Sequence, residues 1–108
     1  RKYLERGSIR RNLKVTPGLI YNVSSGYRGG LQIKYSFTYN GKEYKGDTKK
    51  LISSSVADKF KDKKLPVVFD SINAVKNEML VLPDDFEKFN LPFPDTLNWT
   101  MILKNKSL

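Results

Sequence analysis

The stretch from Leu31 to Tyr39 constrains the fold more than any other, because its side chains alternate strictly between apolar and polar. The apolar set is Leu31, Ile33, Tyr35, Phe37 and Tyr39, and the polar set between them is Gln32, Lys34, Ser36 and Thr38. This period of two is typical of a strand with one buried and one solvated face, as in antiparallel sheets. Asn40-Gly41 comes next, and this pair readily adopts the two positive φ angles of a type I′ turn. The sequence therefore predicts a two-residue hairpin with a return strand over 42–48.

Three further strands and one short helix are predicted around this hairpin. A strand is expected over 15–23, and two shorter strands over 65–70 and 79–82. Ile52, Val56 and Phe60 are spaced by four residues, which predicts a helix over about 54–63. The side chains expected to face inward are Leu19, Tyr21, Val23, Leu31, Ile33, Tyr35, Phe37, Val56, Phe60, Val67, Phe69, Met79 and Val81.

The two ends of the chain differ from this central part. Residues 2–14 are expected to form a basic arm or short helix with a thin apolar face. Asp84 with Glu87 three residues later resembles a capping box, which predicts a helical turn over 84–89. The apolar segment 95–103 is expected to cover an open end of the core.

The order of these elements predicts an all-β fold with one short helix. Three strands, a helix and two strands, βββαββ, close best as a small five-stranded antiparallel barrel, because closure removes exposed edges. The connectivity is expected to be OB-like or SH3-like. The chain then divides into an N-terminal arm or helix at 1–14, a barrel domain at 15–82 and a covering segment at 83–108.

The composition argues against an enzyme. The chain contains no histidine and no cysteine, which excludes thiol nucleophiles, Ser-His-Asp triads and zinc sites built on those residues. Asp84, Asp85 and Glu87 lack the spacing of a calcium loop, and helix capping explains them better than a hard cation. We therefore expect no catalytic residues, no metal site and no cofactor.

The positive charge is concentrated at the N-terminal end. The chain carries 20 Lys+Arg against 11 Asp+Glu, a net charge of +9. The first fourteen residues hold six of these cations and one acid, Glu5. A basic segment that starts at Arg1, without a methionine, is typical of the residues just after a membrane helix or a cleaved signal. It predicts an exported or membrane-tethered protein of the cell envelope or periplasm, with a cytoplasmic protein as the alternative.

Two segments also resemble a known family. They are Tyr35-Ser36-Phe37-Thr38-Tyr39-Asn40-Gly41-Lys42-Glu43-Tyr44-Lys45-Gly46 and Lys64-Leu65-Pro66-Val67-Val68-Phe69-Asp70-Ser71-Ile72-Asn73. Together with Thr16-Pro17-Gly18-Leu19-Ile20 and Leu80, they resemble the bacterial domain-of-unknown-function family 3592 over about residues 16–82. Phe69 stands where that family has tyrosine, and Ser71 where it has proline. The resemblance implies a small, often membrane-tethered β domain without assigned chemistry.

The loop 24–30 is the best candidate for a recognition site. Tyr27 and Arg28 are its only large side chains, and Lys34 lies on the adjoining strand. An aromatic ring and a guanidinium together can engage a protein, a sugar face or a phosphate. We expect a non-enzymatic binding or structural module whose partner is a protein or envelope component, with an anionic membrane surface at the N-terminal arm. The alternative is a small-barrel nucleic-acid-binding protein, favoured by the net charge and by OB-like connectivity.

Overall fold

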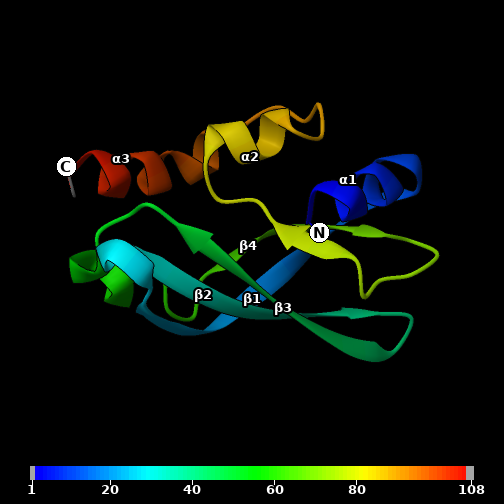
Figure 1. Ribbon diagram of the computed structural model, residues 1–108, viewed down its shortest axis with the longest axis horizontal. Helices are drawn as coiled ribbons and strands as arrows, with labels where there is room; N and C mark the ends of the chain where they lie inside the picture. The colour runs from blue at the N-terminus through cyan, green and yellow to red at the C-terminus, as the bar shows by residue number, and fades with distance from the viewer. Residues whose placement is uncertain (1, 107–108) are drawn as a thin grey trace.

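The computed structural model is a curled five-stranded sheet with short helices along one side (Figure 1). It describes the backbone of residues 2–106 and the side chains of residues 5–26 and 28–105. The strands are β1 (Leu13–Ser25), β2 (Leu31–Tyr39), β3 (Lys42–Lys50), β4 (Lys64–Asp70) and β5 (Asn77–Met79). The helices are α1 (Lys2–Arg11), α2 (Pro83–Glu87) and α3 (Asn98–Lys106), with 3-10 turns η1 (Tyr27–Gly29), η2 (Ser54–Lys59) and η3 (Asp95–Leu97).

The predicted hairpin is confirmed residue by residue. Strands β2 and β3 pair without interruption from Leu31 opposite Lys50 to Tyr39 opposite Lys42. Asn40 and Gly41 have φ angles of 52° and 76°, as a type I′ turn requires. The alternating side chains of β2 point as expected, and Tyr35 is fully buried.

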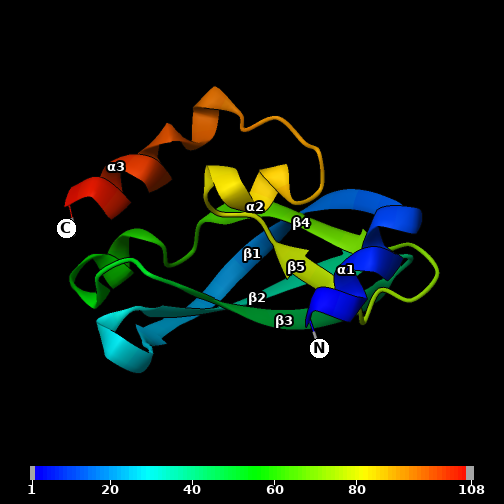
Figure 2. The same ribbon diagram turned by 45° about the horizontal axis from the view of Figure 1, so that its top comes forward.

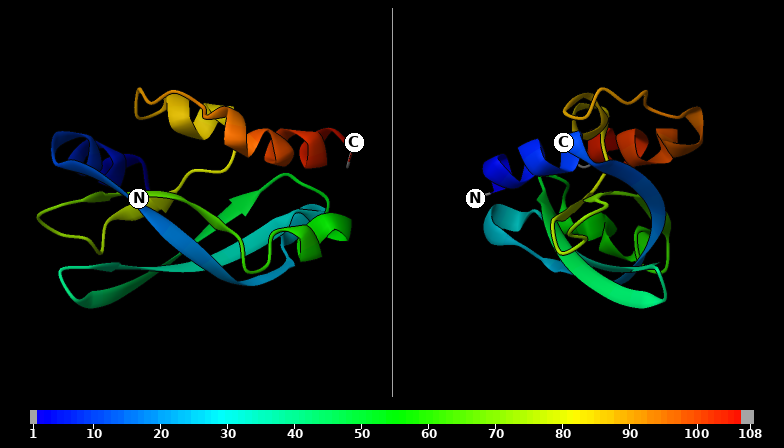
Figure 3. Two further views of the ribbon diagram at one scale, coloured as in Figure 1. Left: turned by 180° about the vertical axis from the view of Figure 1, so that it is seen from behind. Right: turned by 90° about the vertical axis from the view of Figure 1, so that its right-hand side faces the viewer.

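The sheet closes almost completely into the predicted small antiparallel barrel. Its strand order is β3-β2-β1-β4-β5, so that β1 pairs with both β2 and β4, as in the OB-like alternative. The edge strands β3 and β5 then meet across a seam, which we call the β3–β5 seam. A side chain at Gly46 of β3 would collide with Asn77 of β5 and with the Tyr35 hydroxyl, so only glycine fits there. Figure 3 shows the curled sheet end-on in its right-hand view, with the helices along one side of it.

The inward face of β1 differs from the predicted one. Leu19 and Tyr21 are each 40% exposed, whereas Ile20 between them is fully buried. A β-bulge causes the difference, because the pairing with β2 steps from Ile20 directly to Asn22 and leaves Tyr21 without a partner position. Val23, beyond the bulge, again turns inward and is partly buried. The prediction that Leu19 and Tyr21 belong to the core is therefore wrong.

The connection between β3 and β4 is a 3-10 turn instead of the predicted α-helix over 54–63. Val56 leaves helical geometry at φ −107° and ψ 16°. The residues after this turn are held by β1, since Ile20 donates its N–H to Lys63 O at 2.9 Å and accepts from Asp62 N at 3.0 Å. These two bonds use backbone groups that a continuing helix would need, so the turn ends early. Phe60 is fully buried, as predicted, while Val56 is only partly buried.

The last strand is shorter and earlier than expected. Pairing between β4 and β5 covers only residues 77–79, and the predicted strand at 79–82 contributes one residue to it. Leu80, Val81 and Leu82 are nevertheless buried, because the chain leaves the sheet beneath α2 and α3 (Figure 2). Phe60 and Trp99 pack with ring centroids 5.3 Å apart, which fixes the C-terminal segment over the core.

We expect Ile20→Ala to lower the free energy of unfolding by about 2–5 kcal/mol, because it leaves a cavity in the core. Leu19→Ala should change it by less than about 0.5 kcal/mol, since that side chain is exposed. Urea denaturation of both variants measures these two changes in the free energy of unfolding. A larger loss for Leu19→Ala than for Ile20→Ala would contradict the position of the bulge.

Candidate functional site

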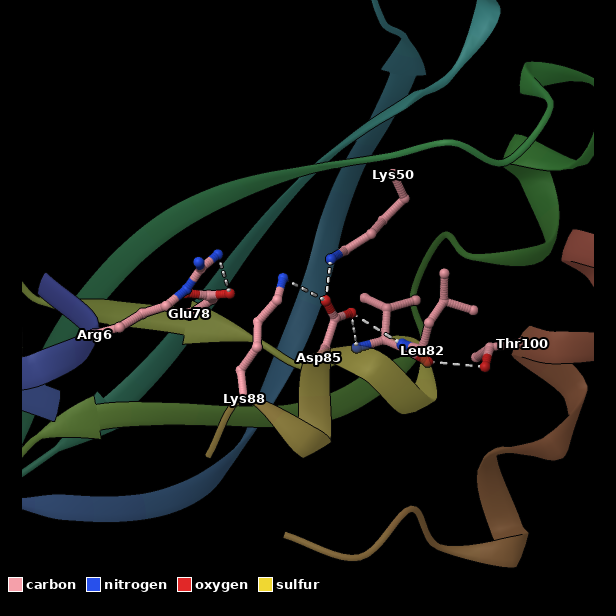
Figure 4. Close-up of polar contacts among 8 residues, drawn as sticks. Arg6, Lys50, Glu78, Leu82, Asp85, Lys88 and Thr100 are labelled. Carbon is pink, nitrogen blue, oxygen red and sulfur yellow. Dashed lines mark hydrogen bonds and ion pairs between the residues drawn. The ribbon is translucent and has the colours of Figure 1, made fainter. Parts of the chain in front are cut away.

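The largest concentration of paired charges lies at the β3–β5 seam (Figure 4). A cleft of about 420 Å³ opens there, and its walls come from α1, β3, β5 and the end of α2. The lining residues are Arg6, Asp47, Thr48, Lys49, Lys50, Glu78 and Lys88. The seam therefore joins four parts of the chain through charged side chains.

Asp85 is the centre of this charge network. Its carboxylate is 1% exposed and accepts from Lys50 Nζ at 2.6 Å, with Lys88 Nζ at 3.8 Å. The other carboxylate oxygen accepts the backbone N–H groups of Val81 and Leu82, each at 3.0 Å. Burial alone would raise the pKa of Asp85, but the Lys50 charge and these hydrogen bonds outweigh it and lower the pKa.

Arg6 and Glu78 form a second ion pair in the same region. Arg6 Nε donates to Glu78 Oε1 at 3.0 Å and Arg6 Nη2 donates to Oε2 at 3.2 Å, which is the forked geometry of a strong pair. The hydrogen bond to Glu78 raises the pKa of Arg6 further. The pair connects α1 to β5, 72 positions apart in the chain.

These contacts favour a structural role for the acids of the seam. A general acid or base needs a carboxyl whose pKa lies near the working pH and which has room for a substrate proton. Glu78 has both oxygens occupied by Arg6, and the pKa of Asp85 is lowered by Lys50 and two backbone N–H groups. Within the residues that the structure describes, no group of three or more acidic side chains is placed to hold a metal ion.

Sequence reasoning assigned the wrong acid to the helix cap. Asp84 was expected to begin the turn with Glu87 as its partner, but both side chains are exposed. The turn begins after Leu82, and Asp85 at its third position reaches back to the free N–H groups. The sequence does contain a capping signal, but because Asp84 and Asp85 are adjacent, it does not show which of them caps the helix. The contact of Asp85 with Lys50, which favours Asp85, is not visible in the sequence.

The structure does not bring Arg28 and Lys34, two of the three predicted binding residues, into one site. The side chain of Tyr27 lies outside the described residues. Arg28 is exposed in η1 with a φ of 62° and lines a small hollow of about 190 Å³. The hollow is completed by Gly26, Gly30, Leu31, Lys49, Lys50 and Leu51. Lys34 is exposed but lies on the outside of β2, opposite Asp47, and does not line this hollow.

Lys34 instead shares the outer face of β1–β3 with an aromatic ring that sequence reasoning missed. This outer face consists of the solvent-facing side chains of three strands, namely Leu19, Tyr21, Gln32, Lys34, Ser36, Lys45, Asp47 and Lys49. Lys45 Nζ lies 5.3 Å from the centre of the Tyr21 ring, a cation–π contact that crosses β2. Gln32 Nε2 donates to Asp47 at 3.2 Å. The outer face thus carries three lysines and one exposed aromatic ring, which Lys45 contacts.

We expect Asp85→Ala to lower the free energy of unfolding by about 3–5 kcal/mol, because it leaves Lys50 buried without its partner. Asp84→Ala is the matched control, and it should have an effect below about 0.5 kcal/mol. The contribution of Asp85 is present above the ordinary aspartate pKa of 3.8 and is lost as the pH falls through the lowered value. The stability difference between wild type and Asp85→Ala should therefore shrink below that pH. Chemical denaturation across an acid pH series measures it, and a difference that grows on acidification would contradict this assignment.

Comparison with known proteins identifies no relative of this chain. No protein-family model, no curated protein and no solved structure matches it. The resemblance to domain-of-unknown-function family 3592 therefore rests on the sequence segments between residues 16 and 82 alone, and it stays a prediction. None of the helices among the described residues is long and apolar enough to cross a membrane.

Proposed function

We propose that this protein is a non-enzymatic binding module of the cell envelope, exported or tethered through a segment that precedes α1. The attachment of α1 to the barrel carries the proposal. Ile9 is fully buried, Ser8 donates a hydrogen bond to Asp70, and Arg6 pairs with Glu78. Helix α1 is thus a fixed part of the fold. A tether that precedes it would hold the barrel in one orientation.

The state of the acidic side chains supports a binding role over a catalytic one. Asp70 and Asp85 are both buried, and the pKa of each is lowered. The hydrogen bond from Ser8 lowers the pKa of Asp70, and Lys50 with two backbone N–H groups lowers that of Asp85 against the effect of burial. Such carboxylates are stable as anions and poor at exchanging protons near neutral pH. The exposed lysines of the outer face, together with the Tyr21 ring, offer contacts for a protein or another envelope component.

The location is tested by thiol labelling. The 108 residues contain no cysteine, so Thr38→Cys on the solvent side of β2 introduces one reporter thiol into them. Expressed from the native gene in its source cells, this variant should react with a membrane-impermeant maleimide before lysis. A cytoplasmic thiol protein is the negative control, and lysed cells are the positive control. Labelling of Thr38→Cys only after lysis would overturn the envelope location.

A second candidate function, single-stranded nucleic-acid binding, is favoured by the contact between Tyr21 and Lys45. Binders of this class combine a basic sheet face with exposed rings on which bases stack. OB-like barrels present such a face on their second and third strands. On the outer face, Lys45 contacts the Tyr21 ring, and Lys34 and Lys49 lie on the same face, so that cations and an exposed ring occur together.

Fluorescence anisotropy with single-stranded oligothymidylate at low and moderate salt tests this candidate. If it holds, Tyr21→Ala should weaken binding by about 1–3 kcal/mol, because a stacked base loses its ring. Lys45→Gln should weaken binding and reduce its salt dependence, whereas Lys76→Gln, which lies off the outer face, should do so much less. Affinity equal to that of an unrelated protein of the same net charge would reject nucleic-acid binding.

A further inference from the structure

Two of the most exposed apolar side chains in the described part of the chain lie in one short loop. Ile72 is 80% exposed and Val75 is 71% exposed, and both belong to the connection between β4 and β5. Only Leu51, at 78%, matches them among the large apolar side chains described, and it lies after β3 at the other end of the barrel (Figure 1). The loop therefore presents two strongly exposed apolar side chains at one tip of the molecule.

This loop is rigidly built. Its backbone closes through Asp70, which accepts from Ile72 N at 2.9 Å with its side chain and from Asn73 N at 3.0 Å with its carbonyl. Asn77 Nδ2 donates to the carbonyls of Ala74 and Val75, each at 3.0 Å. Ala74 is buried while its neighbours point outward. Because the hydrogen bonds hold the loop in this form, the exposure of Ile72 and Val75 is a property of the folded state.

Several cations lie at the same end of the molecule as the tip. Ser71 N donates to Asn12 O at 2.9 Å, which places the end of α1 beside the loop. Arg11, Lys14 and Lys76 are the cations of this junction, and the β2–β3 hairpin with Lys42 lies at the same end of the molecule (Figures 1 and 3). The acids at this end are Asp70, which is buried and hydrogen bonded, and Glu43, which is exposed. The tip thus combines exposed apolar side chains with an excess of positive charge.

We propose that this end of the barrel docks onto an anionic lipid surface, with Ile72 and Val75 entering the headgroup boundary and Arg11, Lys14 and Lys76 binding lipid phosphates. Interfacial anchors of peripheral proteins combine buried apolar side chains with basic residues in this way. A lipid surface fits better than a protein partner, because two side chains on a convex tip are far smaller than the roughly 800 Å² per partner of a stable protein interface. A bilayer accepts a convex tip without a complementary shape.

Sedimentation of the 108-residue chain with vesicles tests the docking. We expect binding to vesicles of equal parts phosphatidylglycerol and phosphatidylcholine, and much weaker binding to phosphatidylcholine alone. The double variant Ile72→Ser/Val75→Ser should lower the partition coefficient at least about tenfold. Lys14→Gln and Lys76→Gln should each lower it about fivefold. The matched controls are Leu51→Ser for the apolar pair and Lys61→Gln for the cations, and both should bind as the wild type does.

A fluorescent side chain gives a second measurement that does not depend on removing residues. The emission that Ile72→Trp adds to that of Trp99 should be quenched by phospholipids brominated on their acyl chains, and the emission that Leu51→Trp adds should not be. Equal losses in tip and control variants, or equal quenching at both positions, would overturn the proposal, as would vesicle binding that leaves Ile72→Trp unquenched. The vesicle assay needs no tether, so its outcome is separate from that of the thiol labelling.

Discussion

Strand β1 is the constraint on which the rest of this structure depends. It is the central strand of the sheet, and it pairs with β4 from Leu13 to Leu19 and with β2 from Leu19 to Ser25. The exchange of partners happens where the bulge at Tyr21 increases the local twist, and this lets a five-stranded sheet curl toward closure. The same position supplies Ile20, which holds the turn after η2 through two backbone bonds. Without this bend, β3 and β5 would stay apart and the seam would not form.

The sequence predicts those parts of the barrel that depend on residues close together in the chain. The hairpin of β2 and β3 follows from alternation and from Asn40-Gly41, and the structure confirms both. The face of β1 was missed because Leu19, Ile20 and Tyr21 are all apolar, so that their alternation cannot reveal an inserted residue. The helix expected at 54–63 has the right hydrophobic spacing, but backbone bonds to a distant strand override it.

The candidate sites were harder to predict, and the reason is also physical. Arg6 and Glu78 are 72 positions apart, and Lys50 and Asp85 are 35 apart, so neither pair leaves a local pattern. Local reasoning therefore predicted a basic arm or short helix at the N-terminus, but not that Arg6 would tie it to the barrel. The loop 24–30 was predicted as a recognition site because Tyr27 and Arg28 are its only large side chains. Tyr21 on the outer face was missed because the strand was expected to point it inward.

Once the structural cations are set apart, two regions of the remaining surface charge differ in character. Arg6 and Lys50 are engaged in forked or buried pairs and contribute little field outside the molecule. The lysines of the outer face share it with an aromatic ring, whereas the cations near the end of α1 share their end of the molecule with branched aliphatic side chains. Flat rings suit stacking and sugar faces, and aliphatic groups suit lipid, so the two regions differ in the partners that they fit.

The attachment of α1 also has a consequence for the order in which the chain acquires its structure. The partners of α1 are Asp70, Glu78 and the carbonyl of Lys88, which are made 62 to 78 positions after the residues that contact them. A ten-residue helix is only marginally stable alone in water, so it gains its stability from those partners. During synthesis α1 therefore reaches its folded position only after the later strands that it packs against have been made. Helix α1 therefore lacks its stabilising contacts until the residues around Asp70, Glu78 and Lys88 have been translated.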